Sequence, residues 1–196
     1  MTNSSTAIII LAAGSSSRLG LPKQLLQHNN ESLLRHSVET ALSAHPAEVL
    51  VVLGFEADRM KHEVDDLPVR VVLNSSWQEG IASSIKKGIG SLPDQTGGAL
   101  ILLCDQPSVT TDLLQKLISS CTDERPIAAT AYNQTVGVPA CYRRSIFGEL
   151  LQLKGDGGAK RIIEQDPNRT AIIPSSQTMV DIDTLEDYQK YIQRPQ

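Results

Sequence analysis

The sequence has little of what builds metal centres or disulfide frameworks. It contains three cysteines and four histidines among 196 residues. The cysteines form no Cys-x-x-Cys pair, and the histidines show no metal-ligand spacing. These patterns exclude the usual zinc signatures and a disulfide-stapled secreted fold. A chain of this length buries a sufficient core without such cross-links.

Long apolar runs and an excess of positive charge are missing as well. No apolar run approaches the roughly 20 residues that span a bilayer. The first residues, MTNSST, lack the cationic and apolar regions of a signal peptide. The formal net charge of −4 argues against a general nucleic-acid surface. We therefore expect a cytoplasmic protein that binds neither nucleic acid nor membrane and that binds any anion through a local site.

What the sequence does contain is an alternation of strand and helix patterns. Continuous apolar runs, typical of strands buried on both faces, occupy 6–12, 47–54, 68–74 and 98–105. Helical patterns occupy 31–45, the segment after Gly54, 80–89 and 110–120. Further strands are predicted at 125–132, 136–142 and 169–174, two helices within 144–165, and a closing segment at 179–192.

This alternation predicts an α/β fold. We expect a three-layer sandwich around a mainly parallel, mixed sheet of Rossmann-like type. Without linker or repeat, residues 1–196 form a single domain, with 1–5 and 193–196 frayed at its ends. In such sheets ligands bind at the carboxyl ends of the strands. Here those ends carry AAGSSSR, LGFEAD, LNSSW and LCDQP, which should meet at one edge.

The stretch LAAGSSSRLGLPKQLL, residues 11–26, leaves the first strand through glycine and serines and then places Arg18 and Lys23. A loop of this kind presents backbone N–H groups to an anion. The glycine spacing fits neither the dinucleotide fingerprint nor the P-loop. A different triphosphate loop is therefore predicted, with a polar loop carrying incidental cations as the alternative.

Several blocks, in the right order along the chain, resemble the nucleotidyltransferases of the molybdenum cofactor cytidylyltransferase branch. LAAGSSSRLGLPK is similar to that branch's L-A-A-G-x-S-x-R-M-G-x-x-K signature. NSSWQEGIASSI (74–85), LLCDQP (102–107), LKGDGGAK (153–160) and VDIDTLEDY (180–188) resemble its other elements. Leu19 and Ile81 replace the usual methionines. Val138 stands where many relatives have histidine, which bears on the identity of the second substrate.

The resemblance implies an enzyme that moves CMP from CTP to the terminal phosphate of molybdopterin. Pyrophosphate leaves and molybdopterin cytosine dinucleotide forms, with Mg²⁺ as the cofactor. A molybdoenzyme or its maturation chaperone would be a further partner. A phosphate nucleophile is already ionised at neutral pH, so no general base is required. Positioning and charge neutralisation are the main demands of this chemistry.

Roles follow for individual residues. Arg18, Lys23 and Asp105 are predicted to be catalytic, with Asp105 and Asp183 holding the metal. Capping of the following helix is the alternative for each aspartate, and an ion pair with Glu79 is the alternative for Arg18. Residues expected to bind the nucleotide are Leu11, Ala12, Ala13, Gly14, Ser15, Ser16, Lys23, Asn74, Gly80 and Ser84. Asp156, Gly157 and Asp181 are assigned to the acceptor; Asp156 and Gly157 alternatively open the next helix.

Other functions stay open at this point. A guanylyltransferase of the same fold usually shows Leu-Ala-Gly-Gly where this chain has Leu-Ala-Ala-Gly. Another nucleotidyltransferase with a different phosphorylated acceptor is a second alternative. A non-catalytic molybdopterin carrier is the third, and pyrophosphate release separates it from an enzyme. Trp77 is interpreted as a packing anchor rather than a base-stacking residue.

Overall fold

The computed structural model describes residues 5–132, 135–175 and 180–193. Most of the two ends expected to fray lie outside these ranges. Ser5 and Gln193 are described, and both make backbone hydrogen bonds: the Ser5 carbonyl accepts from the Gly97 N–H, and the Gln193 N–H donates to the Gln189 carbonyl. Within the described residues, no helix is long and apolar enough to cross a membrane.

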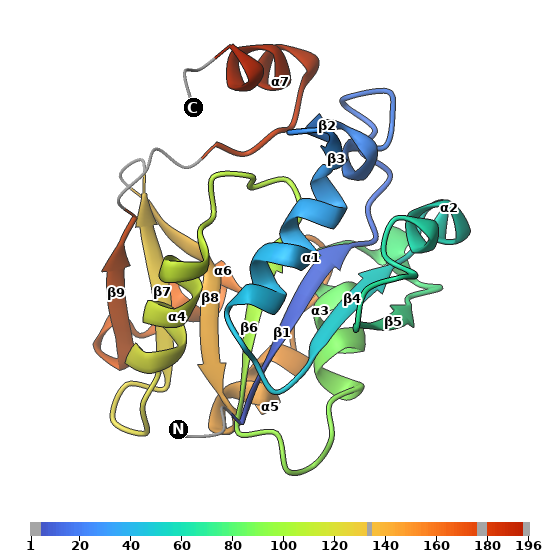
Figure 1. The fold of residues 1–196 in the computed structure, drawn as a ribbon. Coiled ribbons are helices and arrows are strands. Elements are labelled where there is room, and N and C mark those ends of the chain that lie inside the picture. The colour runs from blue at the N-terminus through green and yellow to red at the C-terminus, as the bar shows by residue number, and fades with distance from the viewer. Residues whose placement is uncertain (1–4, 133–134, 176–179, 194–196) are drawn as a thin grey trace.

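A seven-stranded sheet forms the centre of the molecule (Figure 1). Its order is β5-β4-β1-β6-β8-β7-β9. The strands are β1 (Thr6–Ala12), β4 (Val49–Leu53), β5 (Arg70–Leu73), β6 (Gly98–Leu103), β7 (Ile127–Tyr132), β8 (Thr135–Arg143) and β9 (Thr170–Pro174). Only β8 runs against its neighbours β6 and β7; the remaining pairs are parallel. The predicted mixed, mainly parallel sheet is confirmed.

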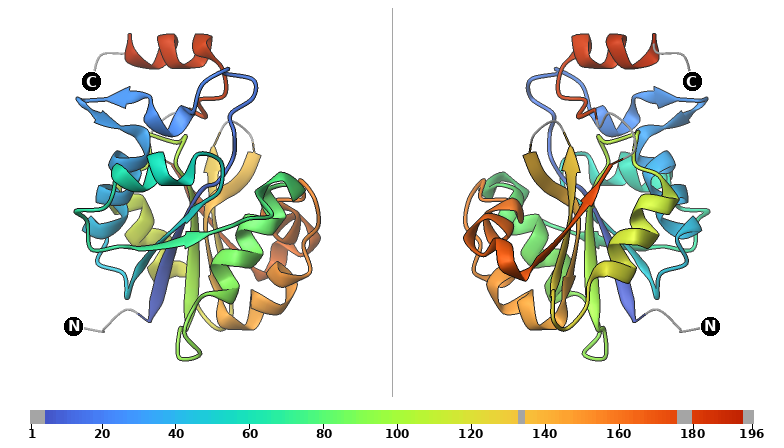
Figure 2. Two further views of the ribbon diagram at one scale, coloured as in Figure 1. Left: turned by 90° about the vertical axis from the view of Figure 1, so that its right-hand side faces the viewer. Right: turned by 90° about the vertical axis from the view of Figure 1, so that its left-hand side faces the viewer.

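Helices cover both faces of the sheet and complete the three layers (Figure 2). One face packs against α1 (Leu33–Ser43), α2 (Ala57–His62) and α4 (Thr111–Ser120). The other packs against α3 (Ile81–Gly90), α5 (Phe147–Leu151) and α6 (Lys160–Gln165). Strand β1 supplies both cores in alternation, because its odd and even side chains point to opposite faces. This is why its sequence is a continuous apolar run.

The ends of the elements differ from the sequence-based ranges. Strand β6 stops at Leu103, so Asp105 lies in a turn two residues beyond the strand rather than at its end. The first helix begins at Leu33, because the Ser32 hydroxyl accepts a hydrogen bond from the Arg35 N–H and caps it. Immediately before it, β2 (Gln27–His28) and β3 (Glu31–Ser32) form a short hairpin that the sequence pattern did not predict.

The C-terminal segment returns to this hairpin. Helix α7 (Leu185–Ile192) lies above β2 and β3 in Figure 1. A small apolar cluster joins the two regions through Leu19, Leu26, Leu33 and Ile182, with Tyr188 and Tyr191 packed against it. The Ile182 N–H also donates to the Asp105 carbonyl at 3.0 Å. Residues 182–183 are thereby held beside the turn that follows β6.

Candidate functional site

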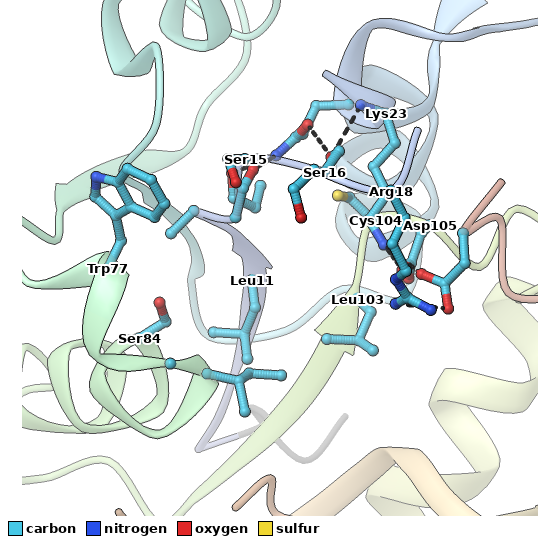
Figure 3. Close-up of a pocket in the computed structure, with 18 of the residues that line it drawn as sticks. Leu11, Ser15, Ser16, Arg18, Lys23, Trp77, Ser84, Leu103, Cys104 and Asp105 are labelled. Carbon is cyan, nitrogen blue, oxygen red and sulfur yellow. Dashed lines mark hydrogen bonds and ion pairs between the residues drawn. The ribbon is translucent and has the colours of Figure 1, made fainter. Parts of the chain in front are cut away.

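The carboxyl ends of β1 and β6 open into a cavity of about 520 Å³. Figure 3 shows Trp77 and Ser84 on one side of it, Arg18, Lys23 and Asp105 on the other, and Ser15 and Ser16 between them. The residues lining the cavity are Leu11, Ala12, Ala13, Gly14, Ser15, Ser16, Ser17, Arg18, Lys23, Gln24, Trp77, Gln78, Gly80, Ile81, Ser84, Leu103, Cys104, Asp105, Asp156 and Asp183. Segments far apart in the sequence therefore share one site.

The two cations of the site are paired with two of the three carboxylates that line it. Lys23 Nζ donates to Asp105 Oδ2 and, at 3.1 Å, to Asp183 Oδ1. The Arg18 guanidinium lies 3.1 Å from Asp183 Oδ2. Arg18 thus pairs with Asp183 rather than with Glu79. The four charges form one connected cluster beside the serine loop.

Burial sets the electrostatics of this cluster. Burial alone would lower the pKa of Lys23, but the charge of Asp105 and the hydrogen bond to it outweigh that effect and raise the pKa. Burial raises the pKa of Asp105, and the charge of Lys23 offsets this only in part. Next to it, burial raises the pKa of the Cys104 thiol to about 12. Cys104 is therefore a neutral wall of the cavity rather than a nucleophile.

The donor set fits a magnesium ion. Asp105 Oδ1 is buried and has no hydrogen-bond partner among the described residues, a costly state that a cation would relieve. Asp183 stands opposite on the same lysine, and its side chain is 34% exposed. No group of three or more His, Cys, Asp or Glu side chains that could hold a metal ion occurs in the described parts of the chain. Two carboxylates beside an open cavity match Mg²⁺, which fills its remaining positions with phosphate oxygens and water.

Helix capping falls to other residues than these aspartates. The Thr110 hydroxyl accepts from the Leu113 N–H and caps α4. Thr184 and Asp187 form a reciprocal capping box at the start of α7. Both aspartates considered as caps, Asp105 and Asp183, instead direct their carboxylates at Lys23.

The opposite wall is built on the start of α3. Gly80 has φ +94°, and a Cβ there would lie 2.5 Å from the Gly155 carbonyl, so only glycine fits. Asn74 lies behind this wall and does not line the cavity. Its side-chain amide donates to the hydroxyls of Ser83 and Ser84, at 2.9 and 3.0 Å. Asn74 thus positions Ser84, and its expected direct contact with the nucleotide stays a prediction.

The predicted acceptor residues lie apart from one another. Asp156 lines the cavity, while Gly157 and Asp181 do not. The Gly157 N–H closes a turn onto the Lys154 carbonyl at 3.1 Å, three residues before α6 begins at Lys160. Asp181 is exposed and accepts a hydrogen bond from the Gln106 side chain at 2.8 Å. Val138 does not line the cavity either.

Some residues of the site carried no recognisable signal in the sequence. Gln24 is 1% exposed and reaches the cavity from the short 3-10 helix Lys23–Leu25. Trp77 lines the cavity while also packing edge-to-face on Phe55, with ring centroids 5.6 Å apart. It therefore anchors the loop after β5 as expected, and its other surface is available to a ligand.

Comparison with known proteins agrees with this geometry. Residues 8–170 match the model of the MobA-like NTP transferase domain. The chain is 30% identical to nicotine blue oxidoreductase of Paenarthrobacter nicotinovorans, over 91% of this chain and 92% of that protein. It is 28% identical to bifunctional protein GlmU of Rhodococcus opacus (strain B4) over 82% of this chain, which spans only 33% of GlmU.

Among solved structures, the homologue of Mycobacterium tuberculosis Rv0371c from Mycobacterium sp. strain JC1 is similar throughout. It superposes with a TM-score of 0.84 and 30% identity, covering 96% of this chain and 95% of that one. The family model spans most of the chain and includes both the serine loop and Asp105. The protein is a nucleotidyltransferase of the MobA-like NTP transferase family.

Proposed function

We propose that this nucleotidyltransferase moves CMP from CTP to the terminal phosphate of molybdopterin with the help of Mg²⁺. The observation that carries the proposal is the meeting of Lys23, Arg18, Asp105 and Asp183 around one cavity beside the serine loop. Cations for a triphosphate and carboxylates for its metal are the two requirements of this chemistry. The choice of CTP and of molybdopterin rests on the resemblance of the sequence blocks.

The reaction proceeds in one displacement. A phosphate oxygen of the acceptor attacks the α-phosphorus of CTP, a new P–O bond forms, and the bond to the β-phosphate oxygen breaks, so that pyrophosphate leaves with its electron pair. The attacking oxygen carries no proton at neutral pH, which makes a general base unnecessary. The work of the protein is to align the two phosphates and to compensate their charge.

Each side chain has a part in this alignment. Lys23 and Arg18 hold the β- and γ-phosphates and stabilise the charge that develops on pyrophosphate. The Ser15 hydroxyl and the backbone N–H groups of Ser15 and Ser16 bind phosphate oxygens. Asp105 and Asp183 would hold Mg²⁺, which neutralises phosphate charge when bound. Trp77 and Ser84 border the space left for the base and ribose.

The test is an incubation of the purified protein with molybdopterin, Mg²⁺ and each of the four nucleoside triphosphates in turn. We expect release of pyrophosphate and formation of a molybdopterin dinucleotide with CTP. A protein that binds both substrates without releasing pyrophosphate would be a carrier. Turnover with CTP and another phosphorylated acceptor, but not with molybdopterin, would move the proposal to a different substrate.

The name of one relative requires a further arm. Nicotine blue oxidoreductase is an electron-transfer enzyme by its name, and it aligns with nearly the whole chain. We therefore include NADH and NADPH with a quinone-like dye and follow absorbance at 340 nm. Oxidation of the reduced nicotinamide, without any nucleotidyl transfer, would contradict the proposed function.

A further inference from the structure

We propose that Gln24 is a positioning residue that turns the serine loop into a receptor for phosphate. This inference rests on the proposed function only in taking the cavity as a triphosphate site. Gln24 is polar, uncharged and 1% exposed, and it belongs to neither apolar core. A buried amide persists only where its hydrogen-bonding groups are satisfied. The side-chain partners of Gln24 are the last residue of β1 and the loop that follows it.

The side-chain amide of Gln24 bridges the two ends of the turn that leaves β1. Its Nε2 donates to the Ala12 carbonyl at 2.9 Å and to the Gly14 carbonyl at 2.8 Å. Its Oε1 accepts from the Ser16 hydroxyl at 3.4 Å. The same Ser16 oxygen accepts from the Lys23 N–H at 3.1 Å. A closed set of contacts therefore links the loop to the residue that carries the phosphate-binding amine.

These contacts decide which polar groups the loop presents to the cavity. The carbonyls of Ala12 and Gly14 are taken by Gln24, that of Ala13 by the Phe55 N–H, and that of Ser16 by the N–H groups of Leu19 and Gly20. By contrast, the backbone N–H groups of residues 15–18, all within the described chain, donate to no acceptor in the structure. Four carbonyls of this stretch are thus engaged, while the four backbone N–H groups of residues 15–18 are not.

The loop therefore presents hydrogen-bond donors, rather than acceptors, to an anion in the cavity. Unengaged N–H groups carry partial positive charge toward the cavity, and the repelling carbonyl oxygens are tied elsewhere. Only a side chain with two N–H donors and one acceptor on the same end satisfies all three contacts. Glutamate would place acceptors against the two carbonyls, and methionine would leave both carbonyls unpaired. The chemistry therefore specifies glutamine at this position.

The experiment compares the Gln24→Met variant, which keeps the side-chain length, with the wild type. Binding of inorganic tripolyphosphate, CTP and cytidine is followed, in the presence of Mg²⁺, through the fluorescence of Trp77, the single tryptophan. We expect roughly tenfold weaker binding of tripolyphosphate and of CTP, by similar factors, and unchanged binding of cytidine. A merely structural defect would weaken all three together. Gln27→Met, the same change at an exposed glutamine three residues away, is the control.

A folded Gln24→Met protein with wild-type affinity for tripolyphosphate would overturn the proposal, as would an equal loss for cytidine. If that variant does not fold, the wild-type protein provides the test. The side-chain NH₂ resonances of Gln24 should be protected from exchange and should shift on addition of tripolyphosphate but not of cytidine. Unshifted resonances would overturn the assignment. Tripolyphosphate carries neither a base nor an acceptor, so a failed transfer assay with molybdopterin leaves this test unaffected.

Discussion

A carboxylate that is removed from water beside one lysine gains attraction and loses hydration, and Asp105 is in this position. Its Oδ2 pairs with Lys23, while its Oδ1 has no partner in the described structure. Burial dominates, as the raised pKa of Asp105 shows. The charge at residue 105 is therefore kept at a cost in stability, which is typical of functional sites.

Substituting Asp105→Asn separates function from stability. We expect turnover with Mg²⁺ to fall by on the order of 10²-fold or more, because a metal ligand is lost. The melting temperature should stay the same or rise, since the unpaired buried charge is removed while Lys23 keeps Asp183 as a partner. Steady-state rates and thermal melts measure the two effects. Asp112→Asn, which removes an exposed ion pair with Lys116, is the control. Normal Mg²⁺-dependent turnover of Asp105→Asn would refute the ligand assignment.

Ala13 is the residue to which we assign the choice of base. It is 4% exposed, lines the cavity and precedes the glycine of the loop. Its β-carbon limits how closely a base approaches, which favours a pyrimidine. We expect clear preference for CTP over GTP, and measurable GTP use by Ala13→Gly, because one methyl-sized contact is worth roughly 1–3 kcal/mol. Initial rates with both nucleotides decide; equal use by the wild type would move the assignment to a guanylyltransferase.

At the scale of elements, the entry into α3 is held against the turn after α5. Gly80 adopts φ +94°, and its Cα faces the Gly155 carbonyl at a distance that leaves no room for a side chain. The Ala82 N–H donates to the same carbonyl at 3.1 Å. This contact fixes one wall of the cavity, because Ser84 lies in α3 and Asp156 comes directly after Gly155.

Gly80→Ala tests that wall. Backbone strain and the clash with Gly155 should lower the free energy of unfolding by about 1–3 kcal/mol and weaken nucleotide binding. Gly90→Ala, at the other end of α3, is the matched control because a Cβ there meets no atom within 4 Å. Urea denaturation and binding titrations provide the readouts. Equal stability of the two variants would show that the Gly80 contact carries no energy.

The docking of α7 on the hairpin depends on His28. Nδ2 of Asn29 only donates, so Nε2 of His28 accepts from it, and Nδ1–H donates to the Tyr191 hydroxyl at 3.0 Å. A second proton on Nε2 would face the Asn29 donor. Burial, with the nearby His36 ring, lowers the pKa of His28, and Glu31 counteracts this in part. The neutral ring is thus the form that the folded state favours.

A lowered histidine pKa contributes stability above the unfolded value of 6.5 that is lost as pH falls through the folded value. We therefore expect the melting temperature to fall by about 2–4 °C between pH 7.5 and 5.5, with faster hydrogen exchange in α7. His28→Gln should remove part of this dependence, whereas His62→Gln, at an exposed ring, should not. An unchanged pH profile in His28→Gln would exclude His28 as its origin.

At the scale of the whole molecule, the local sequence pattern predicted the sheet but only part of the site. The apolar runs predicted β1, β4 and β6 because both faces of these strands are buried, and the family signature indicated Lys23 and Asp105. The sequence left Asp183 between cap and ligand, since DIDTLED supplies several capping residues; the structure gives the cap to Thr184 and Asp187.

Contacts between distant segments were beyond the reach of the sequence. The pairing of Tyr191 with His28 joins residues 163 positions apart, and the sequence around either residue does not indicate it. Gln24 resembles any glutamine in a polar segment until the loop folds over it. The hydrogen bonds of Asn74 were hidden for the same reason, because its partners Ser83 and Ser84 are brought to it by packing of α3 on the sheet.

The pairing of Lys23 and Arg18 with Asp105 and Asp183 makes this cluster of four charges electrically neutral. A metal ion entering alone must compete with Lys23 for Asp105, and a triphosphate entering alone must compete with Asp105 and Asp183 for Lys23 and Arg18. Lys23→Met should therefore bind Mn²⁺ more tightly than the wild type without nucleotide, roughly tenfold, while Lys116→Met should not. Equal Mn²⁺ affinity in the two lysine variants would contradict this competition.

The neutrality of this cluster affects which of the solutes of a cell the protein binds. Because its four charges sum to zero, the cluster offers no net charge attraction to chloride and other small anions, nor to unchelated divalent ions. A metal–nucleotide chelate offers new partners to the cations and to the carboxylates of the cluster at once, so that the three ionic contacts are exchanged in a single event. The cluster thereby favours a metal–nucleotide chelate over a lone anion or a lone metal ion, before any contact with a base or a sugar is made.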